Sequence, residues 1–340
     1  MLKVAARICG LHAQLMSSAE LTLWARLDGL RPGAVRKALW EDRALVKMWA
    51  MRGTLHLLPA AEFSLWQAAL STYGHFLKPA WLRWCGITLD DVEKLVLAVG
   101  AALDGRTLTR AELAAEVSRR TRSRLGEKLL QSWGMTLKPA TYRGNLCFAP
   151  SRGANVCFTL PRWWLKGARA KDPQRARSEI IGRFLSLNGP ATRDEVGRWW
   201  GAQAAPAQKL IEAHDVTAVD VEGTRAFALS RDLHELSEAD PPRSVRLLPA
   251  FDQFVIMTPR RAPLTARERI YRPQGWISPV LLVGGRMAGL WRLERKGRRA
   301  VVQLEPFGKL ERWARSAAEE EAERLAVFSS TELHRVEGAE

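Results

Sequence analysis

The sequence predicts an α+β fold that is mainly α-helical, with one unit repeated three times ahead of a β-rich C-terminal region. Helix-start signals of the form S/T-x-x-E occur at residues 17–20, 109–112 and 192–195. In such a capping box, the hydroxyl and the carboxylate each accept a hydrogen bond from an otherwise unpaired backbone donor. Each signal is followed by a helix, a break, a second helical pattern and two strand-like runs around a turn. The sequence therefore predicts three tandem winged helices.

The elements of the three units are predicted in order along the chain. In residues 1–105, the second helix is expected near residues 32–42, with strands LVKMWAM and TLHLL around Arg52 and Gly53, followed by linking helices. In residues 106–170, the segment GEKLLQSWGMTL precedes strands NLCFAP and NVCFTL. In residues 171–240, the segment PAQKLIEAH precedes strands VTAVDV and RAFAL. These ranges are the predicted winged-helix domains.

Residues 241–340 have a different character and form the fourth predicted region. The segments RLLPAFDQFVI and 276–307 alternate apolar and polar residues around Gly-centred turns, which favours antiparallel hairpins, and residues 309–328 are predicted as a terminal helix. The predicted hairpin at 286–299 is strongly basic, because Glu294 is its only acidic residue. Its six basic residues are Arg286, Arg292, Arg295, Lys296, Arg298 and Arg299. Together with Trp291, they can follow phosphates and wedge between bases. The alternative is a sheet edge protected by charge.

Composition narrows the classes of partner. The 340 residues carry a net charge of +16, which favours a polyanionic partner, although a GC-rich gene would also enrich arginine. The four cysteines have neither zinc-ligand spacing nor a disulfide pattern, so we expect a reduced, cytoplasmic protein without metal or cofactor. No apolar run is long enough to span a bilayer, which argues against a membrane partner. Motifs such as GxSxG, the P-loop and HExxH are missing from the sequence.

One polar pair precedes the first helix-start signal. In an extended segment, His12 and Gln14 lie on one face and share a small volume. A neutral imidazole can accept a proton from a water molecule that a carboxamide orients, so His12 and Gln14 are the candidate catalytic residues. If the imidazole takes the proton, the rate should rise near the ordinary His pKa of about 6.5. The alternative is a buried pair satisfied by the backbone, or a helix in which the two side chains diverge.

Four separated stretches carry a resemblance to a known family. They are LHAQ (11–14), MRGTLHLLP (51–59), LLPAFDQF (247–254) and GWISPVLLVGGRMAGLWR (275–292). In this order they resemble the HTH_42 winged-helix family of bacterial DNA glycosylases, in its AlkZ-like branch. The resemblance implies a basic concave scaffold around a catalytic Q-Φ-Q or Q-Φ-D motif, where Φ is apolar. His12-Ala13-Gln14 matches the AlkZ-like Q-Φ-Q form as an H-Φ-Q variant. The relatives carry a further N-terminal helix, so either the printed start is late or that support is missing.

The resemblance also implies an activity. We expect a monofunctional, monomeric glycosylase that hydrolyses the N-glycosidic bond of bulky N7-alkylguanines or N3-alkyladenines in double-stranded DNA, with interstrand crosslinks as candidate substrates. Its role would be base excision repair or self-resistance to a genotoxic natural product. Alkylation makes the base a cationic leaving group, so a sparse site can suffice. The alternative is a non-catalytic winged-helix regulator, which genomic context would distinguish.

The motif MRGTLHLLP suggests two further site residues. Arg52 and His56 are expected near the active centre and the DNA, because a basic residue beside a Gly-containing turn can approach a phosphate closely. The basic hairpin supplies the other predicted DNA contacts, namely Arg292, Arg295, Lys296, Arg298 and Arg299. The alternative for Arg52 is an ion pair with Glu41, and the alternative for His56 is a core residue whose hydrogen bonds are satisfied.

Overall fold

The structure, a computed structural model, describes residues 1–131, 134–165 and 170–338. Unit 1 has the helix, strand, helix, helix, strand, strand order of a winged helix: α1 (Leu2–Arg7), β1 (Leu11–His12), α2 (Met16–Trp24), α3 (Ala34–Trp40), β2 (Leu45–Trp49) and β3 (Leu55–Pro59). Its sheet has the order β1-β3-β2, so the short strand β1 lies against the wing hairpin. The strands and the second helix lie where the sequence predicts them.

Unit 2 repeats this order with α6 (Leu89–Ala102), β4 (Thr107–Thr109), α7 (Arg110–Thr121), α8 (Leu125–Gln131), β5 (Cys147–Arg152) and β6 (Asn155–Thr159). Its sheet has the equivalent order β4-β6-β5. Part of the helix predicted at GEKLLQSWGMTL, at residues 132–133, lies outside the described residues. The domain ranges stay a prediction, and α6, which packs on α7, lies before the boundary expected after residue 105.

Unit 3 contains α11 (Pro173–Asn188), α12 (Arg193–Trp200), α13 (Ala204–Glu212), β7 (Val216–Val221) and β8 (Thr224–Leu229). A single β-bridge from Ala191 to Phe227 takes the place of the short first strand. The linking helices are α4 (Phe63–Leu70), α5 (Pro79–Cys85), α9 (Lys138–Tyr142), α10 (Pro161–Trp164) and α14 (Leu233–Glu238).

The three helix-start signals behave differently. Thr109 and Thr192 form the predicted capping boxes with Glu112 and Glu195. The prediction at Ser17 is wrong, because α2 begins at Met16 and its N-cap, Leu15, makes no capping hydrogen bond through its side chain. Glu20 instead accepts a hydrogen bond from the backbone N–H of Gly33, the N-cap of α3, at 2.7 Å.

The C-terminal region forms a five-stranded sheet of order β13-β12-β11-β10-β9. Its strands are β9 (Val245–Leu248), β10 (Val280–Val283), β11 (Arg286–Lys296), β12 (Arg299–Pro306) and β13 (Glu332–Glu337). Helix α17 (Arg312–Phe328) begins three residues later than predicted, and β13 after it pairs in parallel with β12, so the sheet is not wholly antiparallel. The strand-like segment AFDQFVI is also a wrong prediction, because α15 (Gln253–Met257) and α16 (Arg267–Ile270) lie between β9 and β10.

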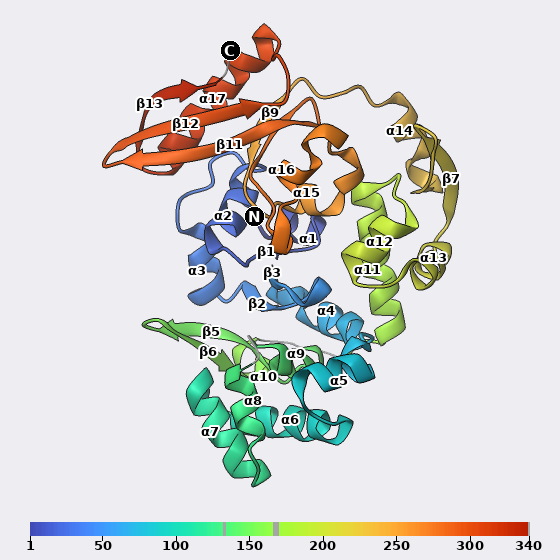
Figure 1. Cartoon of the computed structure of the whole chain (residues 1–340), viewed down its shortest axis with the longest axis vertical. Helices are drawn as coiled ribbons and strands as arrows, with labels where there is room; N and C mark the ends of the chain where they lie inside the picture. Colours follow the sequence, from blue (N-terminus) through green and yellow to red (C-terminus); the bar gives the residue numbers. More distant parts are fainter. Residues whose placement is uncertain (132–133, 166–169, 339–340) are drawn as a thin grey trace.

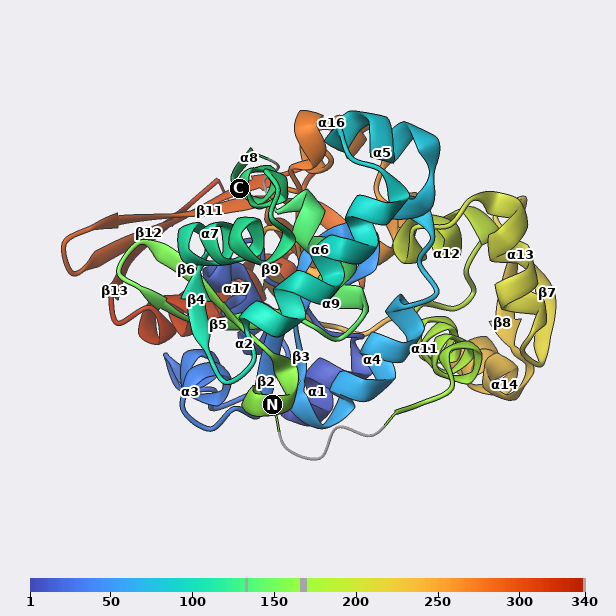
Figure 2. The same ribbon diagram turned by 90° about the horizontal axis from the view of Figure 1, so that it is seen from below.

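Unit 1 holds the molecule together. In Figure 1 it lies in the middle, with the C-terminal sheet and α17 above it, unit 2 below it and unit 3 to the right. Trp24 at the end of α2 is 2% exposed and packs in the core of the C-terminal sheet. Figure 2 shows the hairpin of β11 and β12 extending to the left of the other elements. Strand β2 packs against β5 of unit 2, and Arg52 bonds to Trp199 of unit 3, so unit 1 contacts every other part of the molecule.

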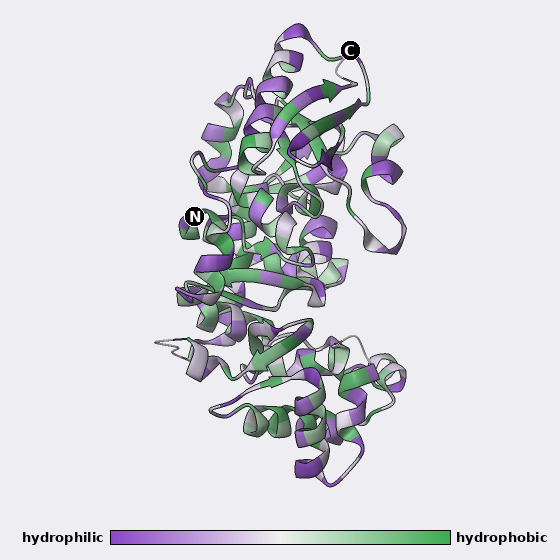
Figure 3. Cartoon of the chain, turned by 90° about the vertical axis from the view of Figure 1, so that its left-hand side faces the viewer, coloured by the Kyte–Doolittle hydropathy of each residue, from purple (hydrophilic) through white to green (hydrophobic). Residues whose placement is uncertain are grey.

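Hydropathy follows this packing. Trp66 is fully buried and Trp24 nearly so, whereas Trp40 and Trp81 are only partly buried. Figure 3 shows hydrophilic and hydrophobic residues interspersed along the helices. Across the described residues, none of the helices combines the length and the apolar character needed to cross a bilayer.

Candidate active site and DNA-binding residues

Strand β1 fixes the position of His12. The chain turns from α1 into β1 through Cys9 and Gly10, whose φ angles are +59° and +91°. A Cβ atom on Gly10 would lie 2.5 Å from the Leu58 side chain, so glycine permits this close approach. In the antiparallel pair of β1 and β3, His12 lies directly opposite His56. The two imidazoles therefore occupy one face of the sheet.

His12 belongs to a stack of rings. Its side chain is 4% exposed, and its ring lies parallel to Phe251 at a centroid distance of 4.9 Å and an interplanar angle of 12°. The edge contact between His12 and His56 has a centroid distance of 5.3 Å and an angle of 76°. Phe251 in turn meets the ring of Trp276 edge to face at 5.0 Å, and Trp276 is 41% exposed. This aromatic stack of His56, His12, Phe251 and Trp276 leads from the interior to the surface.

Burial and a nearby cation keep both imidazoles neutral. Burial, followed by the charge of Arg52, lowers the pKa of His12 from 6.5 to about 3. Burial, followed by the charges of His12 and Arg52, lowers the pKa of His56 well below its usual range. If His12 takes the proton, its lowered pKa moves the expected rate change well below pH 6.5, and the role of His12 as a base stays a prediction.

Several polar atoms beside His12 have no partner. His56 Nδ1 lies 3.1 Å from the carbonyl oxygen of Thr54, which can only accept, so Nδ1 carries the proton and Nε2 is an acceptor. Among the described residues, His56 Nε2, His12 Nδ1 and the Oε1 atom of Gln253 are buried without a hydrogen-bond partner. Buried polar groups are normally paired, so this concentration of unpaired atoms is typical of a ligand site rather than of a packed core.

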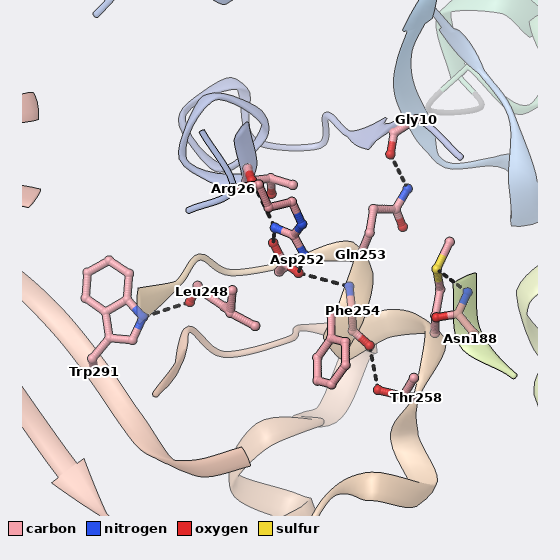
Figure 4. Close-up of polar contacts among 11 residues, drawn as sticks. Gly10, Arg26, Asn188, Leu248, Asp252, Gln253, Phe254, Thr258 and Trp291 are labelled. Carbon is pink, nitrogen blue, oxygen red and sulfur yellow. Dashed lines mark hydrogen bonds and ion pairs between the residues drawn. The ribbon is translucent and has the colours of Figure 1, made fainter. Parts of the chain in front are cut away.

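The segment after β9, residues 251–254, packs against the segment that carries His12. Gln253 Nε2 donates to the carbonyl oxygen of Gly10 at 2.7 Å. The neighbouring Asp252 is fully buried and accepts two hydrogen bonds, at 2.7 and 2.8 Å, from Arg26, which lies two residues after the end of α2. Asp252 also caps α15 through the N–H of Phe254. Figure 4 shows these contacts together. They hold Phe251 and Gln253 against the strand that carries His12.

Gln14 and Arg52 occupy different positions relative to His12. Gln14 is exposed just beyond β1, and its amide makes no hydrogen bond within the described part of the chain. Arg52 is in the left-handed region at φ +58° and donates to the carbonyl oxygen of Trp199 in α12 at 3.1 Å, so it does not pair with Glu41. The charge of Arg52 acts on both His12 and His56, and a role for Arg52 in the site stays a prediction.

The predicted DNA contacts differ in accessibility. His56 is fully buried, so it offers DNA no surface in this conformation. Arg295, Lys296, Arg298 and Arg299 are exposed at the tip of the hairpin, and Arg292 is also exposed but bonded to Gln303. Trp291 is not a wedge: it is 6% exposed and donates to the carbonyl oxygen of Leu248 at 2.7 Å.

Sequence reasoning missed Phe251, Gln253 and Trp276 as site residues. All three lie in stretches that carried the family resemblance, LLPAFDQF and GWISPVLLVGGRMAGLWR. Those stretches were interpreted as strands, and the contacts with His12 join residues more than two hundred positions apart. The resemblance was the only signal in the sequence that connected them.

Comparisons with known proteins agree with this arrangement. A family model described as DNA glycosylase AlkZ-like matches residues 5–328. The chain is 34% identical over 343 residues to the interstrand DNA cross-link repair glycosylase of Streptomyces sahachiroi, covering 96% of this chain and 90% of that protein. The solved structure of Streptomyces sahachiroi DNA glycosylase AlkZ superimposes with a TM-score of 0.87 at 34% identity, covering 98% of this chain and 92% of the other. The chain belongs to the AlkZ-like family of DNA glycosylases, enzymes that hydrolyse N-glycosyl bonds in DNA.

Proposed function

We propose that this DNA glycosylase removes bulky N7-alkylguanines or N3-alkyladenines from double-stranded DNA, with His12 and Gln14 at the reaction centre. The observation that carries the proposal is the neutral His12 imidazole, held in a ring stack beside unpaired polar atoms. The relative from Streptomyces sahachiroi is named for repair of interstrand crosslinks, which supports a bulky substrate and includes crosslinks among the candidates. Action as a monomer, in base excision repair or self-resistance, belongs to the same proposal.

The reaction balances without a cofactor. Alkylation at N7 or N3 places a positive charge on the base, so the bond from C1′ to the base nitrogen breaks and its electron pair neutralises the base. A water oxygen forms a new bond to C1′ and loses a proton to solvent, leaving an abasic site. Because the leaving group is already activated, the protein has only to place the water and stabilise a developing positive charge.

The lowered pKa of His12 supports a role in orienting the water. A base with a pKa of about 3 takes up a proton poorly near neutral pH, so the imidazole orients the water rather than removing its proton. Gln14, exposed at the end of β1, would hold the same water from the solvent side. His12→Gln should therefore keep much of the activity, because a carboxamide also accepts a hydrogen bond from water.

His56 is proposed as a positioning residue rather than a DNA contact. Its Nε2 atom is an acceptor, and its ring makes the T-shaped contact with the ring of His12. His56 Nε2 and His12 Nδ1 both lack a direct partner, so a water molecule that accepts from His12 Nδ1 and donates to His56 Nε2 would favour the His12 tautomer with the proton on Nδ1. That tautomer leaves Nε2 of His12 free to accept from the reacting water. ¹⁵N NMR of His12 tests this role: His56→Leu should mix the two tautomers, and an unchanged His12 spectrum would refute it.

The proposal is tested with DNA duplexes that carry one N7-methylguanine or one bulky N7 adduct. Alkali converts each abasic site into a strand break, which measures excision. His12→Ala and Gln14→Ala should each lower the single-turnover rate by at least roughly a hundredfold. The double variant should be little slower, because the two residues act as one unit.

Lesion-DNA affinity and melting temperature serve as controls and should stay close to those of the wild type. His334→Ala, on the exposed strand β13, is the matched control for substitution of a histidine. Wild-type rates in both alanine variants would exclude the catalytic assignment of His12 and Gln14.

We also propose that the exposed hairpin residues Arg295, Lys296, Arg298 and Arg299 bind DNA phosphates. Arg292 is a weaker contributor, because its guanidinium is already bonded to Gln303 and faces Glu294 at 3.7 Å. Arg52 is half-buried and its charge acts on the histidine pair, so we propose that it acts near the reacting nucleotide rather than on the outer backbone. These contacts are sequence-independent, as expected for an enzyme that recognises a lesion.

A further inference from the structure

A cavity of about 1050 Å³ lies where unit 3 meets the segment between β9 and β10. Its walls come from α12, α13 and β8 on one side and from α15, α16 and Ile277 on the other. Arg52 of unit 1 completes the lining. The volume is at the upper end of the range typical of small-molecule sites, and far larger than a single phosphate group requires.

The cavity has an apolar wall. Phe227, Ile256, Tyr271 and Ile277 line it. The hydroxyl of Tyr271 already donates to the carbonyl oxygen of Val255 at 2.7 Å, so its ring rather than its hydroxyl remains for a ligand. Such a wall suits a flat apolar or aromatic group and gives no favourable contact to a phosphate.

The rest of the lining is strongly basic. Six arginines line the cavity against three carboxylates: Arg52, Arg193, Arg198, Arg225, Arg260 and Arg267 against Asp194, Glu195 and Glu212. Arg260 is engaged with Glu195 at 3.4 Å, and the Arg225 guanidinium lies 5.6 Å from the centre of the Phe227 ring. The Nε atom of Arg267 is buried without a partner among the described residues. The arginine donors favour a ligand that carries acceptor oxygens or negative charge.

Two residues connect the cavity with the reaction centre. Arg52 lines the cavity, and its charge acts on both His12 and His56. Ile277 lines the cavity and directly follows Trp276, the outer ring of the aromatic stack. The cavity therefore adjoins the stack that contains His12.

We propose that this cavity holds the substituent carried by the alkylated base, an aromatic group with acceptor oxygens, while the sugar lies at His12. The inference rests on the proposed function and deepens it, because it assigns the selection of bulky adducts to a separate subsite. The base then occupies the space between the stack and the cavity. Removal of a small adduct such as N7-methylguanine does not need this subsite.

The test compares two substrates in one duplex sequence, N7-methylguanine and N7-(4-carboxybenzyl)guanine. Ile256→Trp fills the cavity from α15, and Arg267→Met removes its unpaired donor without adding bulk. Each variant should lower single-turnover excision of the carboxybenzyl adduct by about tenfold or more, as is usual for a blocked or unpaired pocket contact. Excision of N7-methylguanine should change less than about twofold.

The matched control is Leu264→Trp, because Leu264 is 79% exposed and does not line the cavity. Melting temperatures show whether each variant folds, and Arg267→Met decides the question if Ile256→Trp does not. Equal losses on both substrates would show that the cavity serves the DNA backbone, and no loss on either would show that it is unused. Both outcomes overturn the inference.

The two proposals fail differently. A wild-type enzyme that removes neither adduct refutes the proposed substrate class. A wild-type enzyme that removes N7-methylguanine but not the carboxybenzyl adduct leaves alkyl-base excision intact and overturns the subsite.

Discussion

Acidification should destabilise the protein through His12, and the size of the effect follows from its buried position. The folded state holds His12 with a pKa of about 3, against 6.5 for an exposed histidine. Below pH 6.5 the unfolded chain binds a proton at this residue and the folded protein does not, so stability is lost as the pH falls from 6.5 towards 3. Above pH 6.5 the residue is neutral in both states and contributes no pH dependence.

The magnitude can be worked out for a moderate change in pH. One proton contributes about 1.4 kcal/mol per pH unit, so the 1.5 units between 6.5 and about 5 correspond to about 2 kcal/mol. His12→Gln removes the titrating group and keeps the hydrogen-bonding capacity. Its free energy of unfolding should therefore fall by about 2 kcal/mol less than that of the wild type between about pH 7 and pH 5.

Urea unfolding of both proteins at the two pH values measures this difference. His56 and the carboxylates add to the pH dependence of both proteins, so the comparison isolates His12. His334→Gln, an exposed histidine on β13, is the control and should follow the wild type. Identical pH dependence in the wild type and in His12→Gln would refute the assignment of a buried, neutral His12.

Three further predictions concern the ion pair of Asp252, the charge of Arg52 and the basic hairpin. Asp252→Asn leaves Arg26 without its buried partner and should cost about 3–5 kcal/mol in urea unfolding, whereas Asp90→Asn, in an exposed pair, should cost less than about 1 kcal/mol. Arg52→Ala removes a positive charge that lowers the pKa of His12, so an NMR titration should find that pKa raised, and an unchanged pKa would place Arg52 outside the site. Replacing Arg295, Lys296, Arg298 and Arg299 with alanine should flatten the plot of log Kd against log salt by a few units, at about 0.9 per phosphate contact, and an unchanged slope would remove the hairpin from the DNA interface.

Local signals in the sequence predicted those parts of the fold that depend on neighbouring residues. Thr109 and Thr192 cap their helices because each glutamate lies three positions away and needs no distant partner. The same pattern failed at Ser17, where Glu20 bonds instead to Gly33 across a loop. The segment at Asp252 alternates like a strand, yet its buried ion pair with Arg26 and its cap on Phe254 favour a helix start.

The candidate site was predicted only in part, because sequence patterns report contacts between neighbouring residues and not contacts between distant segments. The pattern of LHAQ singled out His12, and family resemblance added Arg52. The stacking of Phe251 on His12 and the bond from Gln253 to Gly10 join segments that are distant in sequence, and no periodicity reports them. Trp291 was misassigned because the alternation of a hairpin shows that one face is buried without showing which residue fills the core.

The uncapped start of α2 distinguishes unit 1 from the two other copies of the winged helix. In units 2 and 3 the short strand or bridge leads directly into a capping threonine, Thr109 or Thr192. In unit 1, Ala13 and Gln14 separate β1 from Leu15, and the cap is lost. A missing cap typically costs about 1 kcal/mol. Unit 1 gives up that stability at the junction where the other two copies are most regular, and the added residues include Gln14 of the proposed reaction centre. A protein engineer seeking a more heat-resistant enzyme should accordingly leave this junction alone and strengthen unit 2, whose described residues line neither the proposed reaction centre nor the proposed subsite.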